Sequence, residues 1–248
     1  CMRHAQRADE VDDEPWPGQA DRPHDPPLSA AGREQARAAG ADLAAVTAAA
    51  HPSSTRLVTS HFLRCLQTAA GVLAGLRGDG DDETVSLEVD PALGEIAGPP
   101  FITDAPWAGC AEPRDWAWTG GSPASALAAA GLPLSTPIIT PAAWPSPPET
   151  LEAGHARYDR AIAAAAARAA ADATPTTTLI LITHGEAVRR AVTRVCPSAC
   201  VYEVAHCGWV GCEWTEGEEG GGGCDDTWAL LPAKSAGVGW LDPTRTVE

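Results

Sequence analysis

Short apolar runs alternate with long helical runs along this chain, and this alternation is the feature that most constrains its fold. Residues 56–60 (RLVTS) and 178–183 (TLILIT) predict β-strands, and each is followed directly by sequence of helical composition. The second run is apolar on both faces, as is typical of a central parallel strand covered by helices. The pattern therefore predicts an α/β fold, a three-layer sandwich with a mostly parallel central sheet flanked by helices.

Three helices are predicted, over residues 30–49, 61–76 and 151–171. The first is rich in Ala, Arg, Glu and Gln, which have high helix propensity, and Ser29 stands before it where an N-cap residue belongs. A chain of 248 residues is long enough for one large core. We therefore expect residues 1–248 to form a single domain.

Three segments depart from this rhythm. Residues 98–148 are rich in Pro, Gly and Trp with little periodicity, which predicts an insertion or lid over the sheet. Residues 216–226 are Gly-rich and acidic, which predicts a flexible hairpin connection. Residues 1–2 are too short for the buried strand expected before Arg3. We therefore expect a truncated first strand, with the true N-terminus upstream.

Charge and composition exclude several classes of protein. Seventeen basic and thirty-three acidic residues give a net charge of -16, which repels phosphate backbones and argues against a nucleic-acid binder. No apolar run approaches the ~20 residues that span a bilayer, so we expect a soluble, cytoplasmic protein without a membrane partner. Eight irregularly spaced Cys without a CxxC pair predict neither a disulfide framework nor a metal site.

The first candidate cluster is the RHAQR sequence at residues 3–7, at a probable strand end. In it, His4 is flanked by Arg3 and Arg7. For phosphoryl transfer a His must present a neutral ring nitrogen to phosphorus, and neighbouring guanidinium groups both lower its pKa and bind the phosphate oxygens. This cluster therefore indicates a local anion site with a nucleophile.

Two further clusters also follow predicted strands. Arg64 falls in the first turn of the helix after residues 56–60, where backbone N–H groups already favour anions. His184 directly follows residues 178–183, and Gly185 leaves room for a ligand to approach the backbone. Because parallel strands end at the same edge of a sheet, we expect the three clusters to meet there.

In this order the clusters resemble the histidine phosphatase (phosphoglycerate mutase-like) superfamily, with its RHGxR motif, its second Arg and its second His followed by Gly. Residues 25–37 also match the PLTxxGxxQA stretch of that family, and residues 7–12 and 63–69 look like the phosphatase domain of the T-cell ubiquitin ligand (TULA) family. The resemblance implies that His4 is the nucleophile and Glu95 the acid. It implies that the phosphoryl group is bound by Arg3, Arg7, Arg64 and His184, the last also catalytic.

Glu95 would protonate the leaving oxygen and then activate water, provided that its surroundings raise its pKa toward neutrality. Three other carboxylates are alternatives for this role: Glu88, Asp90 and Asp104.

The chain departs from the family pattern at two positions. Ala5 replaces the usual Gly of the first motif, and His61 replaces the usual Pro. If the backbone at position 5 needs a positive φ, the added methyl group costs about 1 kcal/mol and tilts the nucleophile.

The expected reaction is hydrolysis of a phosphomonoester through a phosphohistidine, without a metal or another cofactor, on a phosphorylated small molecule or phosphoprotein. A homodimer is the assembly considered. One alternative is a phosphoglycerate mutase-type phosphotransferase, although residues 98–148 contain Arg114 as their only Arg, and no Lys, to hold a substrate carboxylate. The other is a catalytically weak phosphate-binding scaffold.

Overall fold

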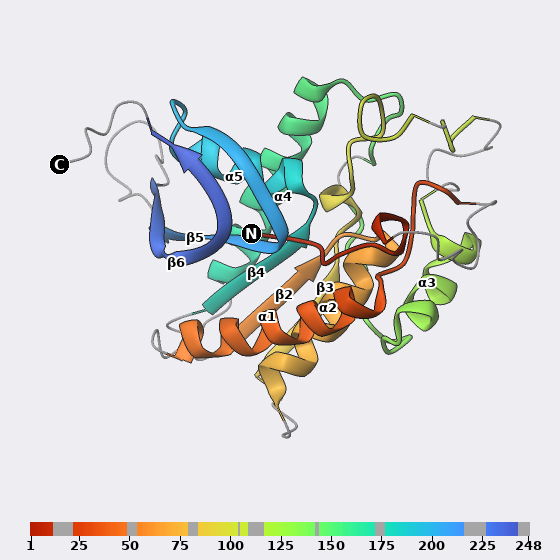
Figure 1. Ribbon diagram of the computed structural model, residues 1–248, viewed down its shortest axis with the longest axis horizontal. Helices are drawn as coiled ribbons and strands as arrows, with labels where there is room; N and C mark the ends of the chain where they lie inside the picture. The colour runs from red at the N-terminus through yellow and green to blue at the C-terminus, as the bar shows by residue number, and fades with distance from the viewer. Residues whose placement is uncertain are drawn as a thin grey trace.

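The computed structural model describes residues 1–11, 22–48, 54–78, 84–103, 105–108, 117–141, 144–171, 177–215 and 227–242. Figure 1 shows a twisted sheet with helices on both faces. The strands are β1 (Met2–Arg3), β2 (Ser54–Thr59), β3 (Val85–Val89), β4 (Thr177–Thr183), β5 (Cys200–Thr215) and β6 (Thr227–Leu241). The α-helices are α1 (Ala30–Ala48), α2 (Leu63–Arg77), α3 (Pro123–Ala130), α4 (Leu151–Ala171) and α5 (Gly185–Val195).

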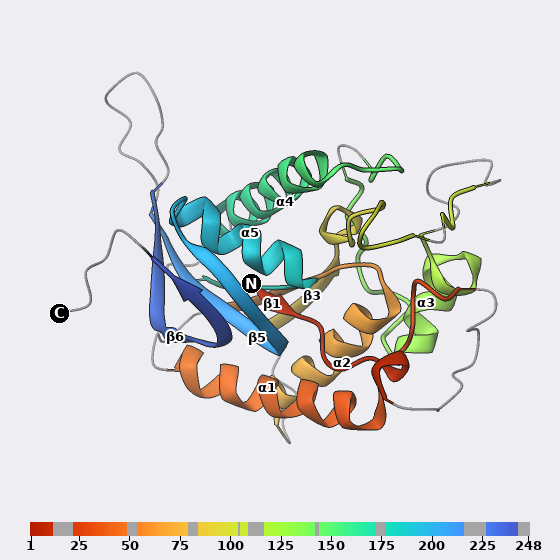
Figure 2. The same ribbon diagram turned by 45° about the horizontal axis from the view of Figure 1, so that its top comes forward.

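The strands form one sheet in the order β3-β2-β4-β1-β5-β6. The first four run parallel, whereas β5 and β6 pair antiparallel at one edge. In Figure 2, α1 and α2 lie on one face of the sheet and α4 and α5 on the other. The predicted α/β sandwich with a mostly parallel sheet is therefore confirmed.

The central strand β4 is apolar on both faces because it contributes to two cores. Ile180 and Ile182 pack in the cluster that contains Leu43 of α1 and Val72 of α2. Leu181 points the other way and packs in the cluster that contains Val188 of α5. Successive side chains of a strand point to opposite faces, so both layers need apolar residues here.

The three predicted helices are present, with bounds that differ by at most two residues. Ser29 caps α1 as predicted, because its Oγ accepts a hydrogen bond from the backbone N–H of Gly32 at 2.9 Å. Helix α2 begins at Leu63, two residues after the predicted start. The difference arises because residues 60–62 form a tight loop in which Ser60 Oγ accepts from the N–H of Phe62 at 3.4 Å.

Gly32 lets α1 approach the loop that follows β1. A Cβ atom at Gly32 would lie 2.1 Å from the carbonyl oxygen of Gln6, which belongs to the RHAQR motif. We expect Gly32→Ala to lower the free energy of unfolding by about 1–3 kcal/mol through overpacking, measured by urea denaturation. Gly185→Ala is the control, since its Cβ would lie 3.6 Å from Arg3, an ordinary contact. Equal stability of the two variants would contradict this packing argument.

Residues 98–148 contain a regular helix, which their composition does not predict. Helix α3 begins after Ser122, whose Oγ accepts from the N–H of Ser125 at 3.2 Å, and ends at Gly131 with φ 73°. Leu127 of α3 packs with Trp118 and with Leu66 of α2 in a third apolar cluster. The helix signals were present as a Ser-Pro start and a Gly end. They did not lead to a prediction, because a helix of eight residues is too short to show a clear hydrophobic period.

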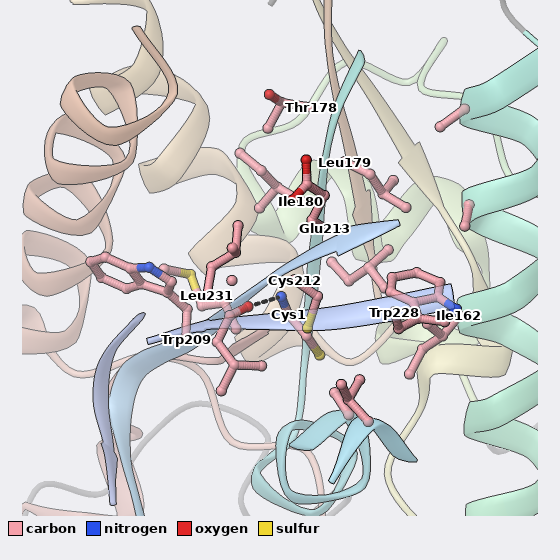
Figure 3. Close-up of a pocket in the computed structure, with 18 of the residues that line it drawn as sticks. Cys1, Ile162, Thr178, Leu179, Ile180, Trp209, Cys212, Glu213, Trp228 and Leu231 are labelled. Atoms are coloured by element: carbon pink, nitrogen blue, oxygen red, sulfur yellow. Dashed lines mark hydrogen bonds between the residues drawn. The ribbon is translucent and has the colours of Figure 1, made fainter. Parts of the chain in front are cut away.

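An apolar cavity of about 720 Å³ lies beside Cys1 (Figure 3). It is lined by residues of α1, α4, β4 and β5, among them Ile162, Leu179 and Trp209. The Cys1 amino group donates a hydrogen bond to the carbonyl oxygen of Val210 at 3.0 Å. None of the residues of the three sequence clusters lines this cavity. It is therefore separate from the candidate site.

The predicted connection 216–226 lies outside the described residues, but the strands on either side pair as a hairpin through Thr215 and Thr227. Among the helices that the structure describes, none combines the length and the apolar composition needed to cross a bilayer.

Candidate active site

The three sequence clusters meet at the carboxyl edge of the sheet. His4 follows β1 and His184 follows β4, and their ring centroids are 5.5 Å apart. Arg64, from the first turn of α2, places its NH2 group 3.2 Å from Nδ1 of His184. Glu95 follows β3, and its Oε2 lies 3.2 Å from the same Nδ1. Four strand ends therefore contribute one group each to a single buried site.

His4 is oriented by its own backbone and held neutral. Its N–H donates to the carbonyl oxygen of Thr183 at 2.9 Å, which continues the pairing of β1 with β4. The ring Nδ1 lies 2.8 Å from the carbonyl oxygen of Ala5, which can only accept, so Nδ1 carries the hydrogen. Burial, together with the charge of Arg64 and the neighbouring His184, lowers the pKa of His4 well below its usual value. In the neutral ring the lone pair is therefore on Nε2.

Arg64 is fixed from several sides yet keeps one donor unused. Its NH1 donates to the carbonyl oxygen of His24 at 3.0 Å and lies 3.6 Å from Oδ1 of Asp25. The guanidinium stacks over Phe62 at 4.5 Å from the ring centroid. Its Nε is buried and has no hydrogen-bond partner in the described part of the chain. A buried charged donor without a partner is costly, and an anion beside Nε would remove that cost.

The two Arg residues of the first motif are held by acidic neighbours. Arg3 donates to the carbonyl oxygen of Val204 at 2.7 Å and lies 3.8 Å from Glu10. Arg7 makes a two-point contact with Asp9, at 2.9 and 3.0 Å. Within the described residues no hydrogen bond joins Arg7 to His4, Arg64 or Glu95. Arg3 thus lies beside His4, whereas Arg7 is turned onto Asp9.

His206 and Glu10 belong to the surroundings of His4, although their sequence context does not predict it. The ring of His206, on β5, lies 6.0 Å from that of His4. Its Nε2 is 2.9 Å from Oε2 of Glu10, outside hydrogen-bond alignment but within ion-pair distance. Burial would raise the pKa of Glu10, but His206 and Arg7 outweigh it and lower that pKa to about 2. His206 lies near His4 because β5, which carries His206, pairs with β1.

Glu95 does not have the raised pKa expected from its proposed role. Burial would raise its pKa, but His184 and Arg64 outweigh burial and lower it to about 2. Burial lowers the pKa of His184 to about 4, with Glu95 opposing the shift. His184 is thus neutral at pH 7, and Arg64, 3.7 Å from Glu95, supplies the charge that keeps the carboxylate ionised. The expectation of a near-neutral pKa for Glu95 is therefore wrong for this structure.

Two of the three alternative carboxylates are engaged elsewhere. Glu88 pairs with Arg56 at 3.6 Å on the sheet. Asp90 caps the turn after β3, since its Oδ1 accepts from the N–H of Ala92 at 2.9 Å. Asp104 lies outside the described residues.

Of the two departures from the family pattern, Ala5 fits the local backbone, whereas both ring nitrogens of His61 lack a hydrogen-bond partner in the described part of the chain. Ala5 is buried, and its N–H donates to Oγ1 of Thr68 at 3.0 Å. Among the described residues other than glycine, a positive φ occurs at Ala105 and Cys207, so the strain considered for Ala5 does not arise. His61 is fully buried, with its ring 5.4 Å from that of Trp118.

Comparison with known proteins relates the chain to one family. The model of the histidine phosphatase superfamily (branch 1) matches residues 1–219. The search among curated proteins found no significant match. Among solved structures the chain is similar to Mycobacterial hydrolase 1, with 19% identity and a TM-score of 0.52 over 93% of this chain and 94% of that one. Mycobacterial hydrolase 2 is similar at 19% identity, with a TM-score of 0.51 over 92% and 86%. At this identity the two structures support the fold alone.

Proposed function

Because the chain belongs to the histidine phosphatase superfamily, a family of phosphatases and mutases, we propose that it hydrolyses phosphomonoesters through a phosphohistidine on His4. The observation that carries the proposal is the state of His4. Its ring is neutral, its Nδ1 is bound to its own backbone, and its Nε2 is left as a nucleophile beside Arg64 and His184.

The first chemical step is an in-line displacement at phosphorus. Nε2 of His4 forms the new bond to phosphorus, while the bond to the ester oxygen breaks and its electron pair leaves with that oxygen. Arg64 and Arg3 stabilise the charge on the transferring oxygens, and His184 contributes its ring. Arg7 joins them when the phosphate draws it from Asp9. Water then attacks the phosphohistidine and releases inorganic phosphate.

Binding of the phosphate itself prepares Glu95 as the proton donor. His184 and the charge of Arg64 keep the pKa of Glu95 low and the carboxyl group ionised. A bound phosphate anion neutralises that charge and adds repulsion, and both effects raise the pKa of the carboxyl group. Glu95 can then take the proton that the ester carries as a monoanion and deliver it to the leaving oxygen. In the second step the carboxylate accepts a proton from the attacking water.

The specific reaction and substrate class need an assay. Phosphate release from a panel of aryl, nucleotide, sugar and phosphotyrosine esters tests hydrolysis, and isomerisation of 3-phosphoglycerate tests the mutase alternative. Isomerisation without phosphate release would contradict hydrolysis. Binding of vanadate without any turnover would indicate a phosphate-binding scaffold. The likeness to TULA-family phosphatases rests on residues 7–12 and 63–69 and makes a phosphotyrosine substrate the first to try.

We predict that hydrolysis needs no divalent metal. The guanidinium groups of Arg3 and Arg64 supply the positive charge that Mg²⁺ supplies in kinases. Activity on an aryl phosphate should therefore be unchanged after treatment with a chelator and removal of the chelated ions. A complete loss that added metal reverses would contradict the proposed mechanism.

A further inference from the structure

One buried guanidinium outside the phosphate site uses all of its donors on the protein. Arg157 of α4 is 4% exposed. Its Nε and NH2 donate to the two carboxylate oxygens of Glu149, at 2.8 and 2.7 Å. Burial would lower the pKa of Arg157, but the bonds to Glu149 raise it, so the group stays charged. Its remaining three N–H groups point at backbone carbonyls.

Those carbonyls belong to the loop that carries Glu95. NH1 of Arg157 donates to Ala92 at 2.7 Å and to Gly94 at 2.9 Å, and NH2 donates to the carbonyl of Glu95 itself at 3.2 Å. A guanidinium has five N–H groups, and all five are thereby satisfied. None is left for a phosphate oxygen, in contrast to Arg64 with its unpaired Nε.

Glu149 holds the other end of the same loop. Its Oε2 accepts from the N–H of Ala97 at 3.0 Å, and its own N–H donates to the carbonyl of Ala97 at 2.8 Å. Helix α4 can come this close because Gly154 faces Ile96, whose Cγ1 would lie 2.6 Å from a Cβ at that position. The loop is thus clamped at both ends by one buried ion pair.

We propose that Arg157 is the positioning residue for Glu95, an inference that rests on the proposed function. The side chain of Glu95 reaches His184 and Arg64 only if its backbone is held at the distance from β4 that the structure shows. Proton transfer needs donor and acceptor within hydrogen-bond reach, and a misplacement of about 1 Å can cost about 10²-fold. Arg157 sets that distance through the backbone, without touching the substrate.

The test is Arg157→Lys. Lysine keeps the charge and most of the length, but its ammonium cannot reproduce the planar set of five donors. We expect the single-turnover rate of phosphohistidine formation to fall about 10- to 100-fold for an alkyl phosphate. For an aryl phosphate the same rate should fall little, because its acidic phenol leaves without needing a proton. Vanadate affinity should stay unchanged, because the phosphate-binding groups do not contact Arg157. Arg160→Lys, an exposed position on the same helix, is the matched control and should behave as the unmodified protein.

Equal losses for the alkyl and the aryl ester, or no loss for either, would overturn the proposal. Loss of vanadate binding would reveal that Arg157→Lys fails to fold. In that case Glu149→Gln is measured with the same two esters, and equal losses for both esters, or no loss for either, would again overturn the proposal. The unmodified protein and Glu95→Gln are run in parallel. If the unmodified protein forms no phosphohistidine, the proposed function and this inference fail together. If Glu95→Gln is selective for the alkyl ester and the clamp variants are not, only the role of Arg157 fails.

Discussion

Replacing His4 with alanine is expected to abolish hydrolysis of an aryl phosphate, with a residual rate at least about 10³-fold below that of the unmodified protein. His4 is the buried group with a free ring nitrogen in the site, and alanine removes the atom that would carry the phosphoryl group. Rapid quenching of the active protein with a labelled substrate should yield an acid-labile, base-stable label on His4.

Two measurements show whether the loss is chemical. The His4→Ala variant should keep its near-ultraviolet circular dichroism, since the backbone bond to Thr183 stays in place. It should still unfold cooperatively, at a modestly lower melting temperature, because alanine removes the buried ring and its hydrogen bond to Ala5. Undiminished activity in the variant, or a label that persists in it, would end the proposed mechanism.

Glu95→Gln is expected to lower the rate of hydrolysis of an alkyl phosphate by about 10²–10⁴-fold, because an alkoxide leaving group needs a proton and the amide cannot supply one. For a substrate whose leaving group is an acidic phenol, the rate of phosphohistidine formation should fall less. Since the proposed mechanism also assigns Glu95 the activation of water in the second step, the comparison requires the single-turnover burst and not the steady-state rate.

Glu88→Gln serves as the matched control for this prediction, because Glu88 pairs with Arg56 on the sheet and not with the site. It should leave the burst unchanged for both substrates. Equal losses for the two leaving groups in Glu95→Gln would assign the acid role to another carboxylate, of which Asp104 is the first to test.

The parts of the site that could be predicted are those in which chemistry follows a strand directly. His4, Arg64 and His184 each come within a few residues of a strand end, and parallel strands place such ends at one edge. The β4 run was recognisable because both of its faces are apolar. These signals are local in sequence, so no knowledge of the tertiary structure was needed.

The contributions of His206 and Arg157 could not be predicted in the same way. His206 reaches His4 because β5 pairs antiparallel with β1, about 200 residues apart in the chain. Arg157 lies in a helix of ordinary composition, and its role depends on the distance between α4 and the loop before Gly98. Helix α3 was missed for another reason, since eight residues are too few to show a period.

The pKa of Glu95 was mispredicted for an electrostatic reason. A carboxyl group buried beside a nucleophile suggests desolvation, which raises the pKa. The opposite shift arises because Arg64 and His184 are within 3.7 and 3.2 Å, a proximity that the sequence does not contain.

The contact between Glu95 and Arg64 also bears on how the product leaves. In the proposed mechanism the Glu95 carboxylate competes with phosphate for the Arg64 guanidinium. After water has attacked the phosphohistidine, Glu95 holds the proton of that water. Once Glu95 has passed this proton to the phosphate or to solvent, the regenerated carboxylate and inorganic phosphate repel one another in a buried space. When the phosphate departs, Arg64 is paired with Glu95, so the departure of the phosphate creates no uncompensated buried charge. Product inhibition by phosphate should therefore be weaker than the number of cationic groups suggests, and stronger once Glu95 is made neutral.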